Sequence, residues 1–111
     1  MKTSSRTSRQ NLKTLSKEDK AALDAEAKTI MESFAHNMTQ GVKLDSQENI
    51  DLLQQHFDWS KKAVTSNKVE YLKMVKNYAK DISSIKALNS IKTGLPSYIK
   101  SVALTNISKI K

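Results

Sequence analysis

The stretch SQENIDLLQQHFDWSKKAV, residues 46–64, decides the fold. Its apolar side chains recur at intervals of three and four residues, which is the period of an α-helix. They form two stripes that lie roughly a fifth to a third of a turn apart at ~100° per residue. The stripes are Ile50, Leu53, Phe57 and Val64, and Leu52, His56, Trp59 and Ala63. A helix that is apolar over so wide an arc is expected at the centre of a bundle, with Asp45 or Ser46 as its N-cap.

The residues before this stretch predict one long helix. Ser16 followed by Asp19 resembles a capping box, and acidic residues in a first turn suit the helix dipole. A single apolar stripe then runs through Leu23, Ala27, Ile30, Phe34 and Met38. Gly41 is predicted to end the helix, because glycine readily adopts the left-handed conformation of that position. Residues 1–15 are polar, basic and aperiodic, so we expect a flexible tail ahead of one domain over residues 16–111.

Three shorter helices are predicted after the central one. The first starts at Lys68, with Asn67 and Glu70 as a capping pair, and runs to about Asp81. The second covers Ser84 to about Lys92. The last follows TGLP, residues 93–96, where glycine stops one helix and proline suits the first turn of the next, and its apolar stripe reaches Ile110. No segment alternates with period two, so the fold class is all-α with about five helices.

The composition excludes several classes of site and of protein. The 111 residues suffice for one domain, and the chain contains no cysteine, which excludes disulfides, thiolate nucleophiles and cysteine-based zinc sites. No apolar run reaches membrane-spanning length and no secretory signal is present, so a soluble cytoplasmic protein without membrane partners is expected.

The net charge of +8 is unevenly distributed. Residues 18–59 carry nine acids against three lysines, whereas residues 60–111 carry eleven lysines against two acids. The two halves are expected to balance one another within the fold. A dedicated nucleic-acid binder more often adds arginine and aromatic platforms, but every basic residue after Trp59 is lysine.

Groups that support catalysis or metal binding are scarce. Gly41 and Gly94 stand alone, so there is no glycine-rich phosphate loop. His36 and His56 lie on different predicted helices without the paired ligands of a metal site. Neither an enzyme nor a bound cofactor is expected.

Methionines and aromatic residues are numerous for a chain of this size. Methionine packs adaptably and aromatic rings offer flat apolar faces, which suits a pocket for a large amphipathic ligand. Phe34 and Phe57 lie on the main stripes and are expected in the core. For Trp59 and the tyrosines, the core or rim and the wall of a ligand site both remain open. The predicted ligand-binding residues are His56, Trp59, Tyr71, Tyr78, Tyr98, Met31 and Met38.

Three segments carry a family resemblance: SKEDKAALDAEAKTIMESFAHNMTQGVKLDSQE (residues 16–48), LLQQHFDW (52–59) and TGLPSYIKSVALTN (93–106). In order and spacing they resemble the TipAS antibiotic-recognition domain, the C-terminal half of TipA-type regulators of the MerR family. The resemblance covers about residues 16–108. It implies a globin-like helical fold that captures bulky antibiotics such as thiopeptides in a cleft between helices, in the service of transcription regulation and antibiotic resistance.

The residues that match the family pattern are His56, Trp59, Gly94, Leu95 and Tyr98, and the resemblance implies that His56, Trp59 and Tyr98 face the cleft. TipA-like proteins can trap thiopeptides through a cysteine, so binding by this cysteine-free chain is expected to be noncovalent. The winged-helix DNA-binding half has no counterpart in the sequence. DNA would be contacted only through such an attached domain, and the oligomeric state stays open.

Two other functions compete with drug recognition. The lysine-rich residues 60–111 and the basic tail suggest a protein that binds nucleic acid. The stripe of Leu52 and Trp59, if exposed, suggests a helical module that binds another protein.

Overall fold

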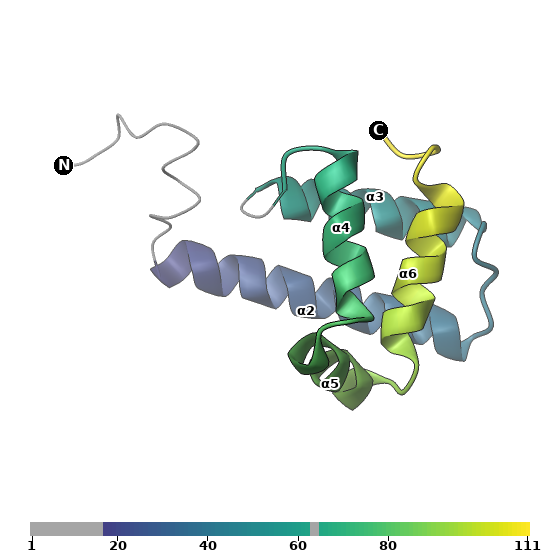
Figure 1. Ribbon diagram of the computed structural model, residues 1–111, viewed down its shortest axis with the longest axis horizontal. Coiled ribbons are helices and arrows are strands. Elements are labelled where there is room, and N and C mark those ends of the chain that lie inside the picture. Colours follow the sequence, from purple (N-terminus) through teal and green to yellow (C-terminus); the bar gives the residue numbers. More distant parts are fainter. Residues whose placement is uncertain (1–16, 63–64) are drawn as a thin grey trace.

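The part of the chain described by the structure, a computed structural model, is residues 17–62 and 65–111 (Figure 1). These residues form five α-helices and no strand, which confirms the all-α prediction. The helices are α2 (Lys17–Thr39), α3 (Gln47–Lys61), α4 (Lys68–Tyr78), α5 (Ile82–Ile91) and α6 (Leu95–Asn106). The predicted tail over residues 1–15, the proposed cap at Ser16, and Ala63 and Val64 of the central stripes lie outside the described residues.

Local capping chemistry sets most of the helix ends. Ser46 is the N-cap of α3, and its side chain accepts a hydrogen bond from the Asn49 amide. Asn67 caps α4 in the same way through the Glu70 amide, while the Glu70 carboxylate reaches back to the Ser66 amide. Gly41 has φ of +69°, as expected for the residue that closes α2.

The boundary between α4 and α5 differs from the prediction. We expected helix three to run to Asp81 and the next helix to begin at Ser84, but α4 ends at Tyr78 and α5 begins at Ile82. Asp81 is the N-cap of α5, because its carboxylate accepts hydrogen bonds from the Ser84 amide and from the hydroxyls of Ser83 and Ser84. These hydrogen bonds also lower the pKa of the Asp81 carboxyl. Asp81, which we predicted at the end of one helix, is therefore the N-cap of the next.

The last helix is also shorter than predicted. It ends at Asn106, so Ile107 and Ile110 of the expected apolar stripe follow the helix instead of continuing it. Ile110 is still buried within the hydrophobic core.

The helices form two crossed layers with α5 at one end (Figure 1). α2 and α3 run antiparallel, and α4 and α6 pass across them. The N-terminal half of α2 extends beyond the other helices, and its side chains are mostly exposed. Phe34 and Phe57 are buried as predicted. The core is built around the fully buried residues Ile30, Phe34, Leu53, Tyr71, Val75, Leu95, Ile99, Val102 and Ala103.

Side chains hold three consecutive carbonyls of the link between α2 and α3. The Tyr98 hydroxyl donates to the Val42 carbonyl, Asn49 Nδ2 to the Lys43 carbonyl, and Asn106 Nδ2 to the Leu44 carbonyl. Asn49 is fully buried, and it also donates to the Tyr98 hydroxyl at 2.8 Å and accepts from Asn37 at 3.0 Å. The three hydrogen bonds fix this loop against α3 and α6, and they supply partners for the polar side chains of the buried residues Asn49 and Asn106.

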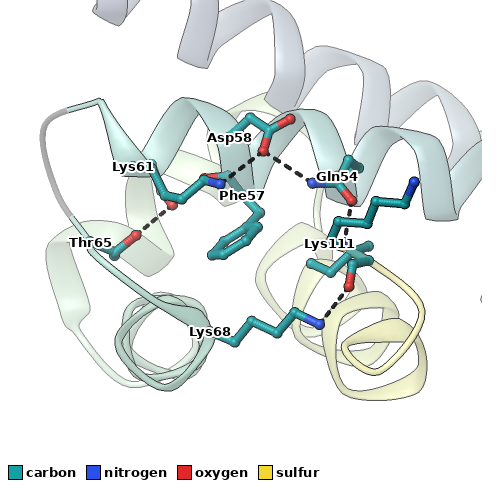
Figure 2. Close-up of polar contacts among 9 residues, drawn as sticks. Gln54, Phe57, Asp58, Lys61, Thr65, Lys68 and Lys111 are labelled. Atoms are coloured by element: carbon teal, nitrogen blue, oxygen red, sulfur yellow. Dashed lines mark hydrogen bonds and ion pairs between the residues drawn. The ribbon is translucent and has the colours of Figure 1, made fainter.

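The end of the chain is fastened to α3 and α4 (Figure 2). The backbone amide of Lys111 donates to Gln54 of α3 at 2.6 Å, and the Lys68 ammonium of α4 donates to the Ile110 carbonyl. Gln54 in turn donates to Asp58, which pairs with Lys61 at 3.5 Å. These contacts hold Ile110 in place where it completes the core.

We expect Asn49→Ala to lower the free energy of unfolding by about 2–3 kcal/mol, because it removes the three hydrogen bonds of a fully buried side chain. Chemical denaturation would measure the loss. Gln55→Ala changes an exposed residue of the same helix and should stay within about 0.5 kcal/mol of the unaltered chain. Equal stability of the two variants would contradict the role given to Asn49.

Candidate functional site

An aromatic cluster surrounds His56 of α3. The ring of Trp59 stacks on the imidazole with centroids 5.5 Å apart and planes inclined by 12°. Phe34 of α2 and Tyr71 of α4 approach it edge-on at 5.8 and 5.3 Å, and Tyr78 lies 6.0 Å away. Such contacts fix the orientation of the imidazole from several sides.

Both imidazole nitrogens of His56 lie beside tyrosine hydroxyls. Nδ1 is 2.8 Å from the Tyr71 hydroxyl, and Nε2 is 3.4 Å from the Tyr78 hydroxyl. Burial lowers the pKa of His56 from 6.5 to about 3, so the ring is neutral at pH 7. Burial raises the pKa of Tyr78 to about 12 and that of Tyr71 further still, with the nearby Tyr78 contributing to the latter. The Tyr71 hydroxyl, the His56 imidazole and the Tyr78 hydroxyl are therefore all neutral, and they form a chain of polar contacts that runs from the core outward.

Tyr78 and Trp59 also line an apolar hollow between four helices. Its volume is about 180 Å³. The lining residues are Ala27 and Met31 of α2, Trp59 of α3, Tyr78 of α4, and Ser84, Ala87 and Leu88 of α5. Residues 27 and 31 are one turn apart on α2, and residues 84, 87 and 88 share one face of α5, so the two helices form opposite walls. A hollow with aromatic walls and few polar groups suits a flat apolar group of a ligand.

The Trp59 side chain joins α3 to α2 at the edge of this hollow. Its indole N–H donates to the Leu23 carbonyl at 3.0 Å. Beyond this contact lies a second hollow of about 260 Å³, lined by Asp19, Ala22, Leu23, Glu26 and Lys62. Lys62 and Glu26 form an ion pair of 3.0 Å there, so this hollow is charged where the first is apolar.

The seven predicted ligand-binding residues occupy three kinds of position relative to the apolar hollow. Met31, Trp59 and Tyr78 line the apolar hollow. His56 and Tyr71 lie behind that wall and are fully buried. Tyr98 and Met38 lie elsewhere: the Tyr98 hydroxyl bonds with Asn49 and Val42, and the Met38 methyl packs against Gly94.

Four of the lining residues, Ala27, Ser84, Ala87 and Leu88, are not among the predicted ligand-binding residues. Small and aliphatic residues on a helix face carry no chemical signal of a site. Their part in the hollow follows from the packing of α5 against α2 and α4 in three dimensions.

The described residues bring together no group of three or more His, Asp or Glu side chains that could hold a metal ion. Among them, no helix is long and apolar enough to cross a membrane. What this site offers is a shaped apolar surface.

Comparison with known proteins gives one family. The family model of the TipAS antibiotic-recognition domain matches residues 2–106, which is nearly the whole chain. No curated protein and no solved structure matches the chain significantly.

The buried imidazole predicts a dependence of stability on pH. The folded chain resists protonation of His56 until about pH 3, whereas the unfolded chain takes up this proton near pH 6.5. The unfolded state therefore binds more protons between these values, and the free energy of unfolding falls as the pH is lowered through that range. From pH 7 to 4.5 we expect His56 alone to account for a loss of about 2.5 kcal/mol.

Denaturation of the unaltered chain and of His56→Gln at both pH values would measure this contribution, which the substitution should abolish. His36→Gln changes the exposed histidine of α2 and is the matched control, which should keep the full dependence. An equal pH dependence in His56→Gln and the unaltered chain would show that the imidazole is not buried as described.

Proposed function

Because the chain belongs to the TipAS antibiotic-recognition domain family, we propose that it binds a bulky small molecule noncovalently and that the hollow beside Trp59 receives part of it. The observation that carries this proposal is the apolar hollow between α2, α3, α4 and α5, with Met31, Trp59 and Tyr78 in its walls. The absence of cysteine makes capture through a thiol impossible, so binding depends on shape and apolar contact.

The size of the hollow limits what enters it. Sites that enclose a whole drug-sized molecule measure about 300–1,000 Å³, and this hollow measures about 180 Å³. It accommodates one flat ring system, while the remainder of a larger ligand lies over the surface. The exposed N-terminal half of α2 runs alongside and offers such a surface. Thiopeptide-like antibiotics, which combine bulk with flat rings, fit this mode.

In the biological role that we propose, the chain is the effector or sequestering domain of a MerR-type regulator. Ligand binding would then be relayed to DNA by an attached DNA-binding domain. No catalytic step is part of this role, since the hollow contains no pair of acid and base groups aimed at a bound molecule.

Filling the hollow should abolish ligand binding. Ala87 is exposed at the rim, so Ala87→Phe can place a ring in the hollow with little cost to folding. We expect the Kd for a bound antibiotic to rise at least roughly tenfold, which corresponds to about 1.4 kcal/mol. Trp59 is the single tryptophan of the chain, so its fluorescence reports directly on the hollow during titration with thiopeptides and other bulky natural products.

The control is Thr105→Phe, which adds a ring to an exposed position of α6, a helix that lines neither hollow, and should leave the Kd unchanged. If no compound of the panel alters Trp59 emission or the melting temperature, drug binding is refuted. If a compound binds but Thr105→Phe and Ala87→Phe change its Kd equally, the ligand lies outside the hollow.

A second candidate function, binding to nucleic acid, is favoured by the lysines of the three C-terminal helices. Both ion pairs among the described residues join the acidic half of the sequence to the basic half, but they involve only Lys61, the last residue of α3, and Lys62, which follows it. The lysines of α4, α5 and α6 form no ion pair with a described residue. Lys73 and Lys76 of α4 are exposed.

If these lysines contact phosphates, Lys73→Glu with Lys76→Glu should weaken binding to duplex DNA or RNA strongly at ~50 mM salt and reduce its salt dependence. Lys20→Glu with Lys28→Glu, on the exposed part of α2, is the control with the same change of charge. No binding of the unaltered chain at ~50 mM salt would exclude this candidate.

A further inference from the structure

Three side chains that line the hollow beside Trp59 carry groups able to donate a hydrogen bond. Two of these groups already donate to the protein. The indole N–H of Trp59 donates to the Leu23 carbonyl, and the Ser84 hydroxyl donates to the Asp81 carboxylate. The hydroxyl of Tyr78 is the third, and its partner is His56 Nε2 at 3.4 Å. The role of Tyr78 therefore depends on which of these two groups is the donor.

Tyr71, the more deeply buried of the two tyrosines, determines the direction of the hydrogen bonds that His56 makes. Tyr71 is fully buried, and His56 Nδ1 is the one polar partner of its hydroxyl among the described residues. If Nδ1 carried the proton, the Tyr71 hydroxyl would accept and its own hydrogen would lie buried without an acceptor, which is costly. The favourable arrangement has Tyr71 donating to an unprotonated Nδ1.

The proton of the neutral imidazole then resides on Nε2, because neutral histidine carries one N–H. Nε2–H points to the Tyr78 oxygen and donates to it. The stacked Trp59 and the edge of Phe34 hold the imidazole in this orientation. Tyr78, as the acceptor, does not use its own hydroxyl hydrogen in this contact, and its side chain lines the hollow.

We propose that the relay from Tyr71 through His56 makes the Tyr78 hydroxyl the hydrogen-bond donor of the hollow, so that the site selects flat apolar groups that carry an acceptor atom at the edge. This inference rests on the proposed function of the hollow as a ligand site and adds the chemistry of what it accepts. An aromatic ring nitrogen or a ring carbonyl meets the requirement, and a ring whose only polar group is a donor does not. Tyr78 is the specificity-determining residue, and His56 and Tyr71 are positioning residues that act through it.

The proton arrangement can be tested on the 111-residue chain without any ligand. Two-bond ¹⁵N–¹H correlation spectra of the imidazole distinguish a protonated from an unprotonated nitrogen. We expect His56 to show a protonated Nε2 and an unprotonated Nδ1 at pH 7. Protonation at Nδ1 would overturn the proposal, since Tyr78 would then donate to the imidazole instead of to a ligand.

Selectivity can be tested with two fused-ring probes of similar size. Quinoline carries an acceptor nitrogen, and indole carries an N–H donor. We expect quinoline to bind more tightly than indole by about three- to tenfold, and Tyr78→Phe to remove that preference by weakening quinoline alone. NMR titration that follows the Trp59 indole N–H and the Met31 methyl would give both Kd values.

Tyr98→Phe removes a tyrosine hydroxyl that lies outside the hollow and should preserve the preference for quinoline. If both probes bind in the hollow but Tyr78→Phe affects them equally, the donor assignment is wrong while the ligand site stands. If neither probe shifts the Trp59 and Met31 signals at ~10 mM, the hollow is not a ligand site, and both this inference and the proposed function fall.

Discussion

The constraint on which this structure depends is the burial of a neutral imidazole between two tyrosine hydroxyls. His56 is fully buried, and a polar group in that position is tolerated because each ring nitrogen has a hydroxyl beside it. Tyr71 and Tyr78 both belong to α4. Trp59, which lies one turn after His56 on α3, donates a hydrogen bond to the Leu23 carbonyl of α2. One side chain thereby fixes the mutual positions of three helices, and the hollow forms where α5 closes against them.

The opposite end of the bundle depends on a separate set of buried and half-buried polar groups. Asn49, Tyr98 and Asn106 bond the carbonyls of residues 42–44 and fasten the link between α2 and α3 to α6. Tyr98 belongs to the residues that the family resemblance placed at a cleft, yet its hydroxyl is engaged at this link. The tyrosines therefore have different roles: Tyr98 stabilises the link between α2 and α3, and Tyr78 lines the hollow.

Much of the fold follows from local rules that the sequence displays. Stripes at helical spacing, side-chain caps at Ser46 and Asn67, and the left-handed glycine at position 41 fixed the number and order of the helices. Asp81 was misassigned, since an acidic residue between two apolar stripes suits the end of one helix or the cap of the next, and only the hydrogen bonds with Ser83 and Ser84 decide. The end of α6 was placed too late because Ile107 and Ile110 continue an apolar period without continuing the helix.

By itself the sequence determined the helical class, the aromatic residues able to build a site and the lack of a reactive thiol, because periodicity, capping and residue chemistry are properties of neighbouring residues. Tertiary structure decided which aromatic residues share a site. It brought Met31, Trp59 and Tyr78 together from three helices, closed them in with small residues of α5, and directed Tyr98 to another place. It also gave the hydroxyl of Tyr78 its role, since the direction of a hydrogen bond depends on the partners that packing supplies, and those partners are distant in the chain.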